Sequence, residues 1–104
     1  MQLNEILTKE QKKLQRRTPT AHEKHQFYYV KEFILFCLKN GVSDTSQIDN
    51  KIYSNYVRYL KHTKNNSADT RLDKCYAVRN LLEEYGCSFK PNPWRSYAKY
   101  ARHN

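Results

Sequence analysis

Apolar residues recur every three or four positions in three stretches of this chain, and each stretch follows a residue that can cap a helix. This spacing lines one side of an α-helix, whereas a half-buried strand would alternate apolar and polar residues. Only 2 Gly and 3 Pro occur among the 104 residues, so the turns that join short strands are scarce. The pattern therefore predicts an all-α fold whose helices are separated by short polar breaks.

The first of these helices is predicted over residues 20–39. Thr20 and Glu23 have the spacing of a capping box, in which each side chain binds the free amide of the other residue. Gly41 can adopt the left-handed conformation that commonly ends a helix. The side chains expected to face the core are Phe27, Val30, Phe33, Ile34, Cys37 and Leu38.

Two further helices are predicted in the second half of the chain. Asp49 is expected to cap a helix that ends near His62, and Ser67 is expected to cap one that ends at Gly86. The expected inner faces are Ile52, Tyr56, Tyr59 and Leu60 in the first, and Leu72, Cys75, Val78, Leu82 and Tyr85 in the second.

The two ends of the chain are less apolar than its middle. We expect residues 1–17 to form a basic N-terminal helix or a loosely docked arm, because their apolar residues are sparse. Residues 93–104 are expected to form a basic, aromatic tail, or a short helix that starts at Pro93. Residues 18–92 then form the core of one domain, and the chain as a whole is expected to form a bundle of four to five helices.

The charge balance favours a polyanionic partner. Nineteen Lys and Arg against 10 Asp and Glu give a net charge of +9 and an isoelectric point near 9.6. Such a field attracts nucleic acid, which is the first partner to consider. No apolar run approaches the roughly 18 residues that span a bilayer, and no signal peptide is visible. We therefore expect a cytoplasmic protein with no membrane partner.

The three cysteines predict free thiols. They are odd in number and have no C-x-x-C spacing, so neither a disulfide framework nor a zinc site is indicated. Cys37 and Cys75 fall on apolar helix faces, where a thiol behaves as a small hydrophobic group. Cys87 follows a predicted helix end and is expected to be accessible in a loop.

No pattern of a catalytic or cofactor site is present. His22 and His25 lack the i, i+4 spacing and the acidic partners of a metal-binding helix. Gly41 and Gly86 stand alone, so no glycine-rich phosphate loop is indicated. We expect no enzyme activity, no metal, no cofactor and no small-molecule substrate.

Basic and polar side chains fall where the helices could present them to phosphates. Several avoid the predicted buried faces, and others surround a helix N-terminus, whose free amides favour phosphate. The candidate contacts before the tail are Lys51, Arg58, Lys61, Lys64, Ser67, Thr70, Arg71 and Lys74. In the tail they are Arg95, Lys99 and Arg102, which alternate with Tyr97 and Tyr100 in a pattern typical of phosphate contact and base stacking.

From about Thr18 to Trp94 the chain resembles the SAM-like core-binding N-terminal domain of phage integrases and other tyrosine recombinases. The segments that carry this resemblance are "TAHEKHQFYYVKEFILFCLKNG", "IDNKIYSNYVRYL" and "SADTRLDKCYAVRNLLEEYG", followed by Asn92 and Pro93. The sequence departs from the family pattern after Thr70, where Leu72 comes earlier than the expected leucine.

The resemblance implies a helical bundle that forms one half of a clamp around duplex DNA. It implies DNA contacts from Lys51, Asn55, Arg58, Arg71 and Lys74. The catalytic domain of that family does not fit after Trp94, so we expect no recombination by this chain on its own. The expected role is an accessory or regulatory factor of a mobile element, or the core-binding part of an integrase.

Two alternative functions remain open. The nine tyrosines could form a surface that docks onto a recombinase or onto a second copy of the chain, because aromatic enrichment is also typical of interfaces. The tail could instead bind single-stranded DNA or RNA.

Overall fold

The computed structural model describes residues 1–16 and 18–93, and these residues form an all-α fold. No strand occurs among them, and the only extended pairing there is an isolated bridge between Gln2 and Asp44. The elements are α1 (Leu3–Gln15), α2 (Ala21–Lys39), a 3₁₀ turn η1 (Thr45–Gln47), α3 (Asn50–His62) and α4 (Ala68–Glu84).

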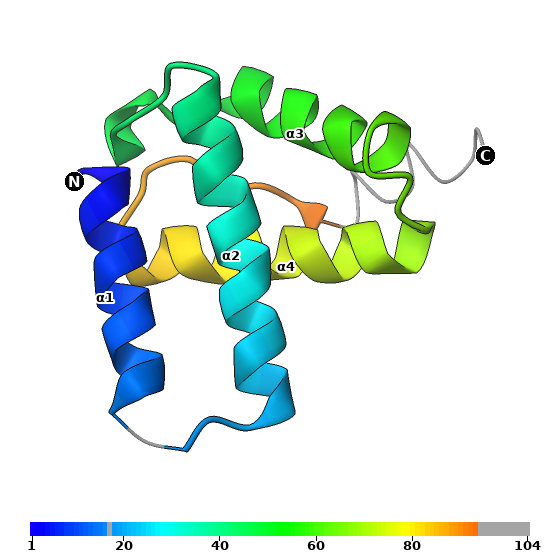
Figure 1. Cartoon of the computed structure of the whole chain (residues 1–104). Coiled ribbons are helices and arrows are strands. Elements are labelled where there is room, and N and C mark those ends of the chain that lie inside the picture. Colours follow the sequence, from blue (N-terminus) through cyan, green and yellow to red (C-terminus); the bar gives the residue numbers. More distant parts are fainter. Residues whose placement is uncertain (17, 94–104) are drawn as a thin grey trace.

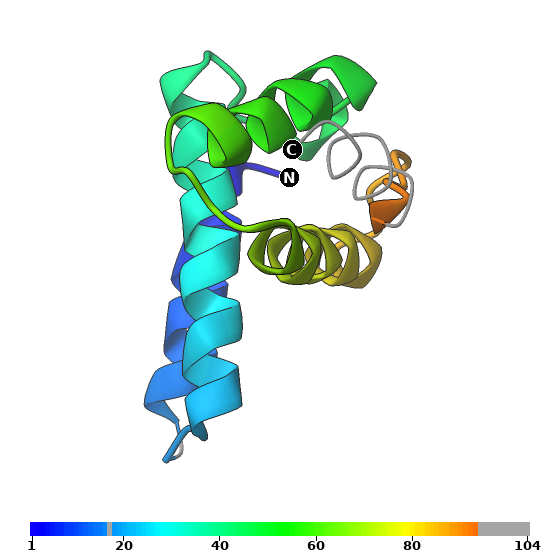
Figure 2. The same cartoon turned by 90° about the vertical axis from the view of Figure 1, so that its right-hand side faces the viewer.

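Helices α1 and α2 form a hairpin, and α3 and α4 lie on one side of this hairpin. Figure 1 shows α1 and α2 side by side, with α4 running across them and α3 near the C-terminal end of α2. Turned by 90°, α3 and α4 project together from the same side of the hairpin (Figure 2). Helix α2 packs against each of the other three helices, and α3 also packs against α4. The core therefore forms around α2.

The core is aromatic at the contact between α2 and α3. The Phe33 and Tyr56 rings meet edge to face with centroids 5.0 Å apart, and neither residue is exposed. An edge-to-face arrangement places the positive edge of one ring on the negative face of the other. Cys37 and Cys75 lie in the same core, which confirms the prediction that they are packing residues.

The predicted helix starts are confirmed. Thr20 and Glu23 form a reciprocal capping box, with the Glu23 amide donating to Thr20 Oγ1 over 3.1 Å. The Asp49 carboxylate accepts from the Ile52 amide over 3.0 Å. The Ser67 hydroxyl accepts from the Thr70 amide over 3.2 Å. Each cap satisfies an amide that has no partner within its own helix.

The predicted helix ends at the two glycines are also confirmed. Gly41 follows α2 with φ of 80°, and Gly86 follows α4 with φ of 67°. Residues with a Cβ rarely adopt this left-handed backbone, which explains why glycine stands at both positions.

Of the two alternatives predicted for the N-terminal segment, a helix is confirmed as α1, and this helix is firmly packed instead of loosely docked. Leu3 and Ile6 are each only 1% exposed and belong to the common core. The Leu3 amide donates to the Ser43 carbonyl over 2.8 Å, and the Tyr85 hydroxyl donates to Glu10 over 2.9 Å. The apolar residues of α1 are few, but they lie on the side that meets α2.

Cys87 is buried rather than accessible. It is 7% exposed, and its thiol lies 3.5 Å from the Thr45 carbonyl oxygen. The segment after α4 folds back across the 3₁₀ turn, a contact between residues 42 positions apart that the loop sequence does not indicate.

The buried faces of α3 and α4 are wider than predicted. Tyr53 and Val57 join the α3 core while Tyr59 is only half-buried, and Ala77 and Leu81 join the α4 core. Both helices pack against two neighbours instead of one, because α4 meets α2 and α3 at once. Of the predicted tail or short helix over 93–104, only Pro93 is among the described residues.

We predict that Ile6→Ala lowers the free energy of unfolding by about 2 to 5 kcal/mol, because it leaves a cavity where α1 meets the core. The control is Gln11→Ala, an exposed position on the same helix, which should change stability by less than about 0.5 kcal/mol. Urea denaturation followed by circular dichroism measures both. Equal, small effects would show that α1 is not part of the cooperative core.

Candidate nucleic-acid interface

Helix α3 presents its basic and amide side chains away from the core. Its buried face is set by Ile52, Tyr56 and Leu60, so the opposite face points outward. Lys51 and Arg58 are exposed on that outward side. The Arg58 guanidinium donates to Asn55 Oδ1 over 3.2 Å, which orients two predicted contacts together.

This part of the molecule contains no acidic residue. From Asn50 to Ala68, which covers α3 and the turn after it, no Asp or Glu occurs. The cations in the same stretch are Lys51, Arg58, Lys61 and Lys64, with His62 beside them. Within this stretch all charges have one sign, which favours a polyanion; the nearest acids are Asp49 and Asp69 at its two ends and Glu32 beside Lys64.

The turn between α3 and α4 carries Lys64 and two predicted hydroxyl contacts. Lys64 Nζ lies 3.9 Å from Glu32, and its side chain remains 45% exposed, so it can still reach a ligand. The Ser67 hydroxyl donates to Thr70 Oγ1 over 3.0 Å while accepting the capping amide. These hydroxyls therefore already serve the start of α4, and Asp69 in its first turn adds a negative charge beside them.

Arg71 and Lys74 are not surface cations. They are 3% and 7% exposed, because both lie on the side of α4 that carries Cys75 and Val78 into the core. Arg71 Nη1 donates to the Asn66 carbonyl over 2.9 Å, and Lys74 Nζ donates to Asn66 Oδ1 over 2.7 Å. Their placement does not support direct DNA contact. Instead, both side chains anchor the turn that presents Lys64.

Lys74 also forms a buried ion pair that connects three helices. Its Nζ lies 2.7 Å from Glu32 Oε1, and the Tyr56 hydroxyl donates to the same oxygen over 3.3 Å. The ammonium group also lies 5.7 Å from the centre of the Tyr29 ring. Burial, together with the nearby Glu32 charge, raises the pKa of Tyr56 well above its usual range, so this hydroxyl stays a donor.

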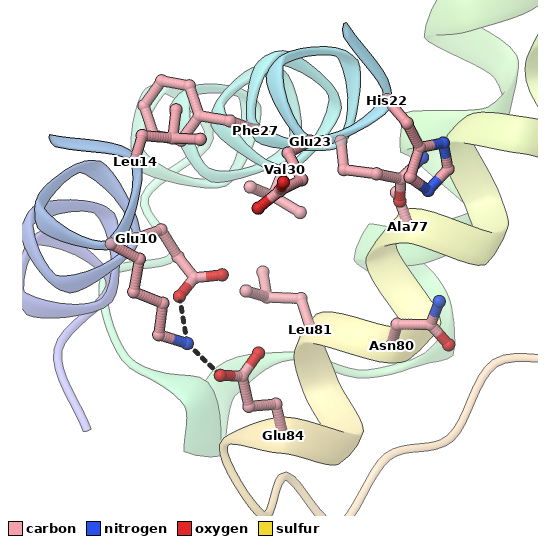
Figure 3. Close-up of a pocket in the computed structure, with 12 residues that line it drawn as sticks. Glu10, Leu14, His22, Glu23, Phe27, Val30, Ala77, Asn80, Leu81 and Glu84 are labelled. Carbon is pink, nitrogen blue, oxygen red and sulfur yellow. Dashed lines mark hydrogen bonds and ion pairs between the residues drawn. The ribbon is translucent and has the colours of Figure 1, made fainter. Parts of the chain in front are cut away.

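A hollow between α1, α2 and α4 is lined by carboxylates, as Figure 3 shows. Its volume is about 260 Å³, and Glu10, Glu23 and Glu84 surround it. Lys13 bridges Glu10 and Glu84, with 2.7 Å between its Nζ and the Glu10 carboxylate. Burial opposes the charge of Lys13, but its bonds to the two carboxylates raise its pKa overall. The charge of Lys13 is thus neutralised, and the three glutamates make this hollow unfavourable for phosphate.

Two of the cysteines carry thiols that burial keeps protonated. Burial raises the pKa of the Cys37 thiol to about 12, and burial also raises the pKa of Cys75, so both stay protonated near neutral pH. Within 1–16 and 18–93 no three His, Cys, Asp or Glu side chains gather in a way that could bind a metal ion. No helix in these ranges combines the length and apolar character needed to cross a membrane.

Of the predicted contacts, Lys51, Asn55 and Arg58 lie on α3, and Lys64 lies in the turn that follows it. Arg95, Lys99 and Arg102 lie outside the described residues. The outward face of α2, where Tyr28 and Leu35 are exposed, is not among the surfaces predicted from the sequence. Their spacing of seven residues, with Lys31 between them, is the signal that could have identified a second apolar face.

We predict that Lys74→Met lowers the free energy of unfolding by about 3 kcal/mol, because the Glu32 carboxylate loses its cation in a largely buried position. The double variant Glu32→Leu, Lys74→Met should recover much of that loss, since it removes both charges. Arg79→Ala is the control, because the exposed Arg79–Glu83 pair contributes less than about 1 kcal/mol. Urea denaturation measures all three. A single Lys74→Met variant as stable as the parent would contradict a structural role for the pair.

Compared with known proteins, the chain matches no family model, no curated protein and no solved structure.

Proposed function

We propose that this chain binds double-stranded DNA through the outward face of α3 and the turn after it. The supporting observation is the acid-free stretch from Asn50 to Ala68 with its four Lys and Arg residues. The contacts in this proposal are Lys51, Arg58 and Lys64 for phosphates and Asn55 for a base edge. No step of catalysis is included.

The dimensions of α3 suit the major groove of DNA. Thirteen residues make a helix about 20 Å long, and the groove is about 12 Å wide, which admits one α-helix. Lys51 and Arg58 are seven residues apart, or about 10 Å along the helix axis. They can therefore reach phosphates on either side of a groove that α3 enters. An Asn side chain at the centre of such a helix can pair with adenine.

The outer side of α4 and the hollow beside α1 are less suitable for a phosphate backbone. The outer side of α4 carries Asp69, Asp73 and Glu83, and the hollow beside α1 is lined by glutamates. Cations on α4 are buried or paired, as for Arg79 with Glu83 at 3.2 Å. Charge therefore favours α3, rather than α4, as the helix that faces the duplex.

The resemblance to the core-binding domain of tyrosine recombinases agrees with this proposal in fold class and in the use of Lys51, Asn55 and Arg58. We accordingly propose an accessory or regulatory role in a mobile element, or a role as the DNA-clamping part of an integrase. The proposal leaves out Arg71 and Lys74, because their burial makes them supports of the turn.

We predict that duplex binding weakens with salt, with a slope of log K against log salt of about −4 to −5, as expected for about five phosphate contacts, three from Lys51, Arg58 and Lys64 and the rest from the tail. Lys51→Ala and Arg58→Ala should each lower the magnitude of that slope by about 1. Fluorescence anisotropy with a 20-base-pair duplex at several salt concentrations measures this. Arg79→Ala removes a cation from the acidic side of α4 and should leave the slope unchanged.

The same titration separates the proposal from binding by the tail. Replacing Arg95, Lys99 and Arg102 together by Ala should cause a partial loss of duplex affinity. Loss of nearly all affinity, or tighter binding of a single strand than of the duplex, would assign binding to the tail instead. Absence of salt-dependent duplex binding at low salt would refute the proposal.

A further inference from the structure

Helix α2 has a second apolar face that points away from the core. Tyr28 is 62% exposed and Leu35 is 49% exposed, although large hydrophobic side chains usually bury more of their surface. They are seven residues apart and so lie on one side of the helix, two turns from each other. Lys31 follows Tyr28 by three positions and Lys39 follows Leu35 by four, so both lysines lie beside this apolar face.

This face borders a groove between α2 and the C-terminal end of α3. The groove has a volume of about 350 Å³. Phe36 and Tyr59 line it with their rings 5.0 Å apart, and both are half-buried, so the groove has a firm aromatic wall. Its other lining residues are Tyr28, Lys31, Glu32, Leu35, Lys39 and Lys64.

The rim of the groove is positively charged. Lys31 and Lys39 come from α2, and Lys64 comes from the turn after α3. Glu32 is the single acid among the lining residues, and it is engaged by Lys74 at 2.7 Å and by the Tyr56 hydroxyl. The negative charge of Glu32 is therefore compensated by buried groups of the protein. Lys31 and Lys39 lie on the exposed side of α2, where they can meet a ligand.

We propose that this groove docks an acidic amphipathic helix of a partner protein. The span from Tyr28 to Lys39 is three turns, about 17 Å, which matches the short helices that lie in grooves with anchors at i, i+3 or i+4 and i+7. Apolar anchors of the partner would cover Tyr28, Leu35 and the aromatic wall. Acidic side chains beside those anchors would pair with the rim lysines.

Charge and chemistry disfavour two other occupants. A second copy of this chain also carries a net charge of +9, so it would be repelled by the lysine rim. Duplex DNA would pair with the lysines but would leave Tyr28 and Leu35 without apolar contacts, since phosphates and sugars form most of its surface. The inference is independent of the proposed DNA binding, because the two surfaces share Lys64 alone among the residues named for them.

The test is a titration of the full ¹⁵N-labelled chain with a synthetic helical peptide, followed by NMR. The probe is a 15-residue peptide with Leu at one heptad-spaced face and Glu at most other positions. We expect amide shifts at Tyr28, Lys31, Leu35 and Lys39, and none on α1. Leu35→Ala and the double variant Lys31→Glu, Lys39→Glu should each weaken binding at least tenfold. Lys9→Glu, Lys12→Glu on the exposed side of α1 is the matched control and should bind as the parent does.

Several results would overturn the proposal. One is a lack of shifts around the groove at millimolar peptide. Another is equal binding of a peptide with Lys in place of Glu, which would show that charge plays no part. A dimer in analytical ultracentrifugation that Leu35→Ala abolishes would assign the groove to a second copy. Duplex DNA shifting the same amides, without dependence on Leu35, would assign it to DNA. Lys51→Ala should leave peptide binding intact, so failure of either proposal can be told from failure of the other.

Discussion

The buried ion pair between Glu32 and Lys74 is the interaction on which the arrangement of the helices depends. It joins α2 to α4, and the Tyr56 hydroxyl brings α3 to the same carboxylate. Removing two charges from water costs several kcal/mol per ion unless they meet each other and further hydrogen-bonding groups. A packing that moved α4 along α2 would leave Lys74 buried without its acid. The ion pair therefore disfavours alternative packings in which α4 is shifted along α2.

The same ion pair explains how the molecule separates its charges. Because Arg71 and Lys74 both bind Asn66, the cations nearest the start of α4 point inward and shape the turn. The outer side of α4 keeps its acids, and α3 with its following turn keeps only cations. A chain with net charge +9 thus has a basic end and an acidic flank. A ligand with many phosphates would meet the basic end first.

Several features of the fold could be predicted because they depend on residues close together in the sequence. The caps at Thr20, Asp49 and Ser67 and the two glycine helix ends each involve contacts within a few positions. Other features could not be predicted. Leu3, Ile6 and Cys87 are buried by segments far away in the chain, and a sparse apolar pattern does not indicate which segment will cover it.

In the candidate interface, too, some features depend on neighbouring residues and others on distant segments of the chain. The sequence by itself determined the helices, the net charge and the outward direction of Lys51 and Arg58, because helix periodicity places them opposite Ile52 and Tyr56. Only the tertiary structure decided which of the remaining cations stay at the surface. Arg71 and Lys74 stand four residues before Cys75 and Val78, on the buried side of α4, and the crossing of α2 over α4 places Glu32 opposite Lys74. A buried charge needs a partner, and for Lys74 that partner, Glu32, is 42 residues away in the sequence.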